Sequence, residues 1–251
     1  MITRGELRKI HGENLPLHIL EQDYIQSLFL QELYDEFDSL AFKGGTYLKH
    51  AFGLDRFSED LDFTAIDSSN LMDILKSTTA NLSPYGIEAD IDKINESEIS
   101  FTSRLRYRGP LYDGSDKSIG NIELEISKRD DIFLEPKWER LFFDYPETRA
   151  VTVLGLQKEE ILCEKLRALS TRNKGRDLYD VWFLFKQDVD INKELFEKKM
   201  KVVDQPLEVN INISKSEWNE DLAVILEKSP RYEDVKEDVL IKLKDSELIV
   251  K

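Results

Sequence analysis

The chain has 251 residues, of which 41% are hydrophobic and 34% charged, a composition typical of a folded protein rather than a disordered one. Its net charge of −15 argues against broad nonspecific binding to nucleic acid, although a local basic patch is compatible with it. No apolar run approaches the roughly 20 residues of a membrane helix, and the opening MITRGELRKI lacks an apolar signal core, so we expect a cytoplasmic protein without membrane contact.

Helical and extended segments alternate along the first half of the chain. Residues 18–37 place apolar side chains at helical spacing, and later stretches alternate in the manner of strands. The expected elements, in chain order, are a helix at 18–37, a short apolar run at 40–42, a short helix at 47–52, an extended segment ending at 60–63, a helix at 69–83, and strands at 87–94, 99–108 and 119–127.

The second half is mainly helical from residue 156 onward. The pattern therefore predicts an α+β protein with two parts. Residues 1–150 would form a catalytic domain with N-terminal helices, and residues 151–251 a mainly helical domain, with the boundary somewhere in 145–157.

Asp60 and Asp62 stand two positions apart in an extended segment, so both side chains should point to one face. Like charges held that close either raise a pKa or share a cation, and Mg²⁺ takes one or two carboxylates together with substrate phosphates. A third carboxylate is expected from a neighbouring strand, where Glu123 and Glu125 share a face. Taken alone, the pair equally describes a solvated strand face.

A Gly-Gly-Thr turn, Gly44 to Thr46, lies upstream of the aspartates between an apolar run and a helix. Glycines there allow backbone N–H groups to approach a phosphate, and a helix N-terminus favours an anion. An ordinary strand-to-helix turn would use the same residues. The order of turn, helix and paired carboxylates is more specific than any single part.

The segment FKGGTYLKHAFGLDRFSEDLDF resembles the first motif of the AbiEii/AbiGii nucleotidyl transferase toxins, a Gly-Gly-Ser/Thr turn followed by Arg-x-Ser-x-Asp-x-Asp. The matching residues are Gly44, Gly45, Thr46, Arg56, Ser58, Asp60 and Asp62. The resemblance implies a DNA-polymerase-β-like nucleotidyltransferase core, with a mixed sheet and flanking helices, followed by a helical C-terminal domain.

The same resemblance implies roles for individual residues. Thr46, Arg56 and Ser58 would line a nucleoside triphosphate pocket together with the glycines, and the two aspartates would hold Mg²⁺ or Mn²⁺. The family's third carboxylate precedes a residue equivalent to Ser127, which favours Glu125 over Glu123, although the family more often has Asp there.

Lys165 lies in the middle of the apolar arc of a helix predicted at 159–172, with Arg172 beside it. A buried lysine costs free energy unless it has an anionic partner, and the alternative is a lysine that extends its ammonium to water.

On the same wheel Glu160, Glu164 and Cys163 are expected on the outer side. Cys163 is the only cysteine, which excludes an internal disulfide and a cysteine-based zinc cluster, and we expect it to be inert.

The segment RDLYDVWFLF is apolar around most of its wheel, and Asp177 and Asp180 share the polar arc. Asp177 could also cap this helix. Together with EKLRAL, the segment resembles the downstream motifs of the same family. That resemblance implies that Lys165 contacts the triphosphate and that Asp177 and Asp180 complete the pocket.

Separately, Arg104, Arg106 and Arg108 alternate along a predicted strand, where they could bind RNA phosphates or pair with nearby acids.

The resemblance implies a metal-dependent toxin of a bacterial toxin–antitoxin or phage-defence pair. Such a toxin transfers a nucleoside monophosphate to an RNA acceptor, the 3′ end of tRNA. Its partners would be a nucleoside triphosphate, a tRNA acceptor, and a cognate antitoxin or antitoxin-encoded regulator. Two alternatives stay open. One is a nucleotidyltransferase acting on a small molecule such as an aminoglycoside, which suits the negative net charge. The other is a catalytically silent nucleotide-binding module.

Overall fold

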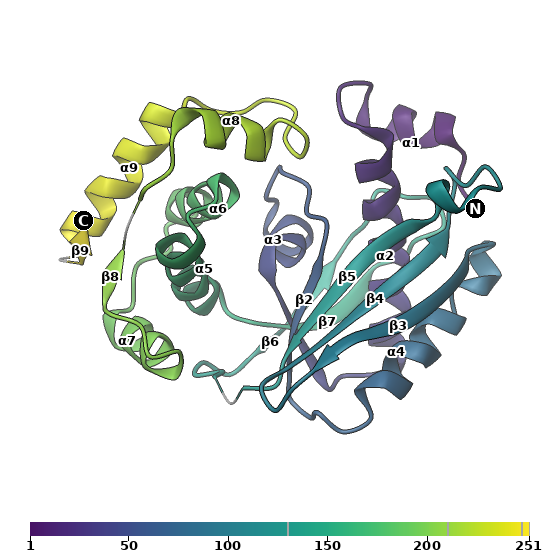
Figure 1. Ribbon diagram of the computed structural model, residues 1–251, viewed down its shortest axis with the longest axis horizontal. Coiled ribbons are helices and arrows are strands. Elements are labelled where there is room, and N and C mark those ends of the chain that lie inside the picture. Colours follow the sequence, from purple (N-terminus) through teal and green to yellow (C-terminus); the bar gives the residue numbers. More distant parts are fainter. Residues whose placement is uncertain (130, 210, 247, 251) are drawn as a thin grey trace. The chain divides into compact units, whose positions relative to one another are not determined.

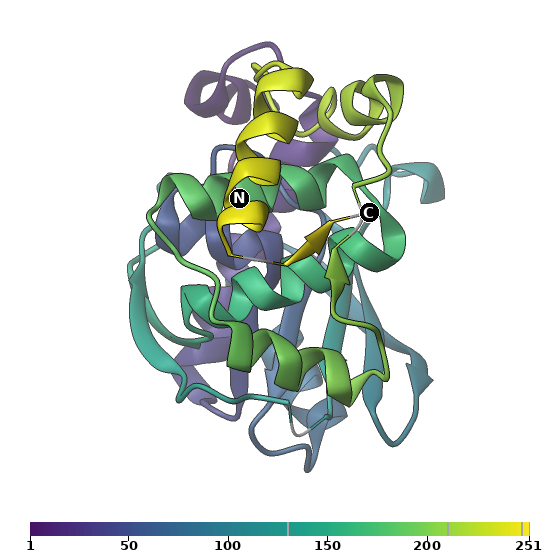
Figure 2. The ribbon, with the colours of Figure 1, turned by 90° about the vertical axis from the view of Figure 1, so that its left-hand side faces the viewer.

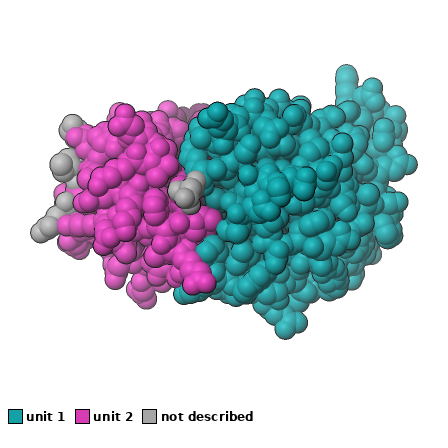
Figure 3. Space-filling view, turned by 90° about the horizontal axis from the view of Figure 1, so that it is seen from below, with its two compact units in different colours: residues 1–130, 136–155 teal, residues 131–135, 156–251 magenta. Residues whose placement is uncertain are grey.

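The computed structural model describes residues 1–129, 131–209, 211–246 and 248–250, and the chain divides into two compact units (Figure 3). Unit 1 consists of Met1–Asp130 and Pro136–Gly155, and unit 2 of Asp131–Glu135 and Leu156–Lys251. No helix in the described part of the chain is both long and apolar enough to span a lipid bilayer.

The strands of unit 1 form one mixed sheet (Figure 1). They are β1 (Leu40–Lys43), β2 (Leu61–Ala65), β3 (Glu88–Glu96), β4 (Ser100–Arg108), β5 (Gly120–Ser127), β6 (Lys137–Leu141) and β7 (Val151–Gly155). Their order across the sheet is β3-β4-β5-β2-β1-β7-β6. The two central strands, β1 and β2, are antiparallel to each other, whereas β2 pairs with β5 and β1 with β7 in parallel.

The helices of unit 1 are α1 (Arg4–His11), α2 (Leu17–Glu36), α3 (Gly44–Phe52) and α4 (Leu71–Ala80). Helix α2 buries residues around nearly its whole circumference, as expected of a central helix rather than a surface one. Next to it, Phe42 of β1 stacks on Phe63 of β2, and Tyr47 of α3 packs against Phe42. These contacts attach α3 to the central strands.

The two faces of the sheet differ in chemistry because side chains alternate along each strand. One face is apolar and buried, and its residues include Leu61, Phe63, Leu105, Leu124 and Ile126. The alternate positions form what we call the polar face: Asp62, Glu123, Glu125, Arg104, Arg106 and Arg108. The register of the strands therefore places Asp62, Glu123, Glu125 and the arginine row on the same side of the sheet.

Unit 2 is mainly helical (Figures 1 and 2). Its helices are α5 (Lys158–Arg172), α6 (Gly175–Lys186), α7 (Lys193–Val202), α8 (Lys215–Leu222) and α9 (Tyr232–Asp245), and a short parallel pair joins β8 (Glu208–Val209) to β9 (Ile249–Val250). Helices α5 and α6 pack together at its centre, with α7 against α5 and with α8 and α9 against α6. The turn between α5 and α6 uses Asn173 in the left-handed conformation, which asparagine tolerates better than most residues.

The predicted fold class is confirmed: a mixed sheet with flanking helices is followed by a helical unit. Three details differ from the expectations. Helix α3 begins at Gly44 rather than at Tyr47, Asp60 lies directly before β2 rather than inside it, and strands β6 and β7 were not anticipated.

Candidate functional site

The turn from β1 into α3 brings Gly44 against Asp62. Gly44 has a φ of +77°, and a Cβ atom at this position would collide with the Asp62 carboxylate. Both the backbone conformation and the lack of space therefore require glycine here. As a result, the carboxylate of Asp62 lies directly against the first residue of α3.

The next residue, Gly45, is approached by the side chains of Arg56 and Ser58. A Cβ atom on Gly45 would lie 2.5 Å from Arg56 Nη2 and 2.8 Å from Ser58 Oγ. The Arg56 side chain is 2% exposed, and its Nη1 donates a 2.8 Å hydrogen bond to the carbonyl of Phe57. A guanidinium and a hydroxyl thus converge on the first turn of α3, where helix N–H groups also favour an anion.

Two hydrogen bonds fix the backbone of the segment that carries these side chains. Thr46 Oγ1 donates a 2.6 Å bond to the carbonyl of Asp60, so the hydroxyl of the Gly-Gly-Thr turn holds the chain just before β2. Gln26 Nε2, from α2, donates a 3.1 Å bond to the carbonyl of Ser58. Gln26 was not predicted from the sequence, although a fully buried glutamine in an otherwise apolar helix is a signal of such a role.

The carboxylates of the polar face are aligned by strand register. Asp62 pairs with Glu125 of β5 on one side and with Lys43 of β1 on the other. Asp62 is half-buried and Glu125 is exposed. Lys43 was also missed from the sequence, and its position directly before Gly44 is the only signal for it.

A metal shared with a ligand fits this donor set better than one held by the protein alone. Within the described ranges, no three His, Cys, Asp or Glu side chains are grouped so that they could hold a metal ion. Carboxylate oxygens are nevertheless hard ligands, and Mg²⁺ is often held by one or two of them plus substrate phosphates. The assignment of Asp60, Asp62 and Glu125 as metal ligands stays a prediction.

The predicted residues of unit 2 form a second group, between α5 and α6. Lys165 Nζ lies 2.7 Å from Asp180 Oδ2 and 3.8 Å from Asp177 Oδ1, and its side chain is 10% exposed. Arg172 donates two hydrogen bonds to Asp177, of 2.7 and 2.8 Å. Lys165 is therefore buried and paired rather than extended to water, and Asp177 engages Arg172 instead of capping α6, whose N-cap residue is Lys174.

Two residues expected on the outer side of α5 are in fact buried. Glu160 accepts hydrogen bonds from the backbone N–H groups of Phe133 and Leu134 and lies 2.8 Å from Lys199 Nζ. Cys163 is also buried, and burial raises the pKa of its thiol to about 12. The expected inertness of Cys163 agrees with this environment. The position predicted for both residues is wrong, because α7 and the 131–135 segment cover that side of α5.

The arginine row lies between acidic strands. On β3, Glu88, Asp90 and Asp92 stand opposite Arg108, Arg106 and Arg104, and Glu123 of β5 stands opposite Arg104 on the other side. Arg108 Nη1 lies 3.1 Å from Glu88 Oε2. The structure therefore favours the alternative that these arginines pair with nearby acids.

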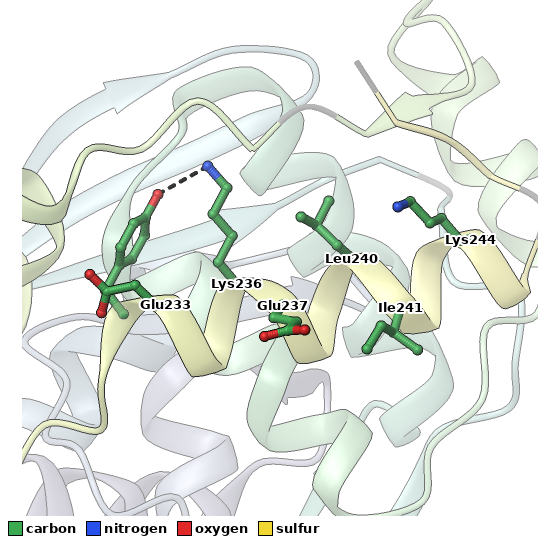
Figure 4. Close-up of a pocket in the computed structure, with 7 residues that line it drawn as sticks. Glu233, Lys236, Glu237, Leu240, Ile241 and Lys244 are labelled. Atoms are coloured by element: carbon green, nitrogen blue, oxygen red, sulfur yellow. Dashed lines mark hydrogen bonds between the residues drawn. The ribbon is translucent and has the colours of Figure 1, made fainter.

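A shallow hollow of about 390 Å³ runs along the outer side of α9 (Figure 4). It is lined by Tyr232, Glu233, Lys236, Glu237, Leu240, Ile241 and Lys244. Figure 4 shows Lys236 donating to the Tyr232 hydroxyl, at 3.1 Å. None of the predicted site residues lines this hollow.

Comparison with known proteins gives one family and several related folds. The family model described as "Nucleotidyl transferase AbiEii toxin, Type IV TA system" matches residues 28–246. MenT4, a nucleotidyltransferase toxin from Mycobacterium tuberculosis H37Rv, is similar in structure with a TM-score of 0.73 and 19% identity, covering 96% of this chain and 88% of that one. JHP933 from Helicobacter pylori has a TM-score of 0.61 and 23% identity, covering 92% of each chain. No protein of curated function matches the sequence.

Proposed function

The chain belongs to the AbiEii family of nucleotidyltransferase toxins of type IV toxin–antitoxin systems, and from this premise we propose that it transfers a nucleoside monophosphate to an RNA acceptor. The nucleoside triphosphate would bind at the N-terminus of α3. The acceptor would be the 3′ end of tRNA, and the reaction would take place in the cytoplasm. A cognate antitoxin, or a regulator encoded with it, is the expected partner.

The observation that supports this proposal best is the convergence of Arg56 and Ser58 on Gly45. The guanidinium and the hydroxyl supply charged and neutral donors, and the first turn of α3 supplies backbone N–H groups. A triphosphate presents oxygen acceptors and negative charge, both of which this set matches. The Asp62 carboxylate against Gly44 lies beside the position where the phosphates would enter.

Asp60, Asp62 and Glu125 would hold Mg²⁺ or Mn²⁺ together with oxygens of the triphosphate. When bound there, a divalent ion would supply charge neutralisation on the leaving pyrophosphate and would lower the pKa of the attacking hydroxyl. Glycine at position 44 leaves room for this carboxylate, because an added Cβ there would collide with Asp62 Oδ2. Positioning and electrostatics supply most of the catalysis in reactions of this type.

We assign Lys165, Asp177 and Asp180 to the same reaction. Lys165 would neutralise phosphate charge, and the two aspartates would complete the nucleotide pocket. The ion pair between Lys165 and Asp180, 2.7 Å apart, holds the ammonium in place between α5 and α6. Arg172 plays the same part for Asp177.

A second acceptor class is favoured by the acids around the arginine row. Because Glu88, Asp90 and Asp92 stand opposite the three arginines, the polar face offers less positive charge than the sequence indicated. A cationic small molecule, such as an aminoglycoside, would be attracted to such a surface. This candidate shares the triphosphate site and differs only in the acceptor.

The test is to incubate the purified protein and Mg²⁺ with each of the four labelled triphosphates, in parallel with total tRNA and with an aminoglycoside mixture. We expect label to enter tRNA, and mass spectrometry of the RNA to show one or more added nucleotides. Label on the antibiotic alone would establish the second candidate. Binding of a triphosphate without transfer to either acceptor would contradict both and would support a silent binding module.

A further inference from the structure

A buried ion-pair network joins α2 to α3. The side chain of Asp23, on α2, is 2% exposed, and its Oδ1 lies 2.8 Å from Lys49 Nζ and 3.5 Å from His50 Nε2, both on α3. Its Oδ2 accepts a 2.7 Å hydrogen bond from the hydroxyl of Tyr145, which in turn lies 3.0 Å from His11 Nε2. One carboxylate on α2 is thus in contact with two consecutive residues of α3.

The network is charged despite its burial. Burial by itself raises the pKa of the Asp23 carboxyl, but the Lys49 ammonium and His50 outweigh it and bring the pKa below its usual value. A buried ion pair adds little net stability compared with apolar packing, whereas removing one partner is strongly destabilising. Such a pair therefore matters most where one particular arrangement of two helices is needed.

The network is connected to the residues that approach Gly45. Lys49 lies four positions after Gly45, on the same side of α3. Its Nζ is 4.6 Å from the centre of the Phe57 ring, a cation–π contact, and the His11 ring meets Phe57 edge-on at 5.4 Å. Phe57 stands between Arg56 and Ser58 in the chain and is itself buried.

We infer that Asp23 is a positioning residue for the triphosphate pocket. Through Lys49 and Phe57 it holds segment 56–58 and the first turn of α3 in one arrangement. The bond from Gln26, which lies three positions after Asp23 on α2, ties the same segment a second time. This inference rests on the proposed function, since it takes segment 56–58 and the first turn of α3 as the receptor of the phosphates.

The first test is the near-isosteric substitution Asp23→Asn, which removes the charge but keeps an acceptor for Tyr145. The KM for the labelled triphosphate and for total tRNA is measured together with kcat, and triphosphate binding is measured directly by calorimetry. We expect the KM for triphosphate and its Kd to rise roughly tenfold to a hundredfold, as small displacements of positioning groups do, with the KM for tRNA unchanged. A merely structural role would lower the active fraction, and hence the apparent kcat, without changing either KM.

The matched control is Glu21→Gln on the same helix. Glu21 is also buried, but it accepts a 2.6 Å hydrogen bond from the N–H of Leu111, in the loop that follows β4. We expect both KM values of this variant to equal those of the wild type. An equal rise in KM for triphosphate in this control would show a general effect of buried acids on α2 and would overturn the inference.

Two further variants keep the test decisive if Asp23→Asn does not fold. Phe57→Leu removes the ring face that Lys49 contacts without leaving a charge unpaired, and we expect a smaller rise in the same KM. In the double variant Asp23→Asn/Lys49→Met, the effects of the two single substitutions should be clearly non-additive, because the residues act as a unit. A folded Phe57→Leu variant with wild-type triphosphate binding would overturn the inference. If the wild type itself binds no triphosphate, the proposed function fails and this inference with it.

Discussion

The two groups of predicted site residues differ in what their charged side chains face. In unit 1, Arg56 donates to a backbone carbonyl and, with Ser58, faces Gly45 at the start of α3. In unit 2, each cation meets a carboxylate, Lys165 at Asp180 and Arg172 at Asp177. The first group is arranged around the first turn of a helix, whereas in the second group the charged side chains pair with one another. The comparison separates residues whose loss should affect mainly the reaction from those whose loss should also affect the fold.

The largest effect is expected for Asp62→Ala. Asp62 is the predicted metal ligand that lies against Gly44, at the turn where we propose that the phosphates bind. We therefore expect transfer to fall by at least about a thousandfold and growth arrest in cells to disappear, with the thermal unfolding temperature little changed. Labelling of tRNA and a growth assay measure this. Asp67→Ala, an exposed acid beyond the end of β2, is the matched control and should keep full activity. Unchanged toxicity of Asp62→Ala would contradict the assignment.

Lys165→Met should affect stability as well as activity. The substitution removes the cation 2.7 Å from the buried Asp180, and the loss of one partner of a buried pair costs about 3–5 kcal/mol. Urea unfolding measures this cost. Adding Asp180→Leu should restore most of the stability but none of the activity, because both residues are assigned to the nucleotide pocket. Recovery of stability and activity together would mean that the Lys165–Asp180 pair has a structural role only.

A smaller effect is expected for Gly45→Ala. The added Cβ would lie 2.5 Å from Arg56 Nη2 and 2.8 Å from Ser58 Oγ, so both side chains must move away from α3. We expect triphosphate affinity to fall roughly tenfold, measured by calorimetry. Gly5→Ala in α1, where a Cβ would meet only Thr3 Oγ1 at 4.0 Å, should leave it unchanged. Equal affinities of both variants would argue against phosphate binding at this turn.

The smallest effect concerns pH. Burial, and then the Lys49 ammonium, lower the pKa of His50 below the ordinary histidine value of about 6.5. As the pH falls, the unfolded chain therefore takes up this proton before the folded chain does. The contribution of His50 to the free energy of unfolding should therefore be constant above about pH 6.5. It should decrease as the pH falls toward the lowered pKa of the folded state. Urea unfolding between pH 7 and 5 should show a shallower slope for His50→Gln than for the wild type. His18→Gln, at an exposed position, should leave the slope unchanged.

The sequence predicted that Gly44, Arg56, Ser58 and Asp62 come together because the signals for this group are local. Gly44, Arg56 and Asp62 stand in one short motif, and the order of turn, helix and strand decides which side chains meet. The partners Gln26 and Lys43 were missed, because a buried glutamine and a lysine at a strand end are individually ordinary. The strand nature of β6 and β7 was also missed, since the pairing of Phe42 with Gly155 joins residues that no local pattern connects.

The sequence predicted unit 2 less completely for a different reason. Lys165 was identified as a buried cation that needs an anionic partner, and Asp180 supplies it. Glu160 and Cys163 were assigned to the solvent side, because a helical wheel counts polarity and not burial. Lys199, fully buried on α7, neutralises Glu160, so both sides of α5 are covered. Only the packing of α7 shows this.

The antiparallel arrangement of β1 and β2, with α3 between them in the chain, has a consequence for folding. Gly44 and Asp62 meet across a loop of roughly twenty residues, a short closure with a modest entropic cost. The contacts among Gly44, Gly45, Arg56 and Asp62 are therefore of low sequence separation, a kind of contact that tends to form early and fast. The centre of the candidate site is therefore built from one continuous stretch of the chain, to which the later strand β5 adds only Glu125, opposite Asp62.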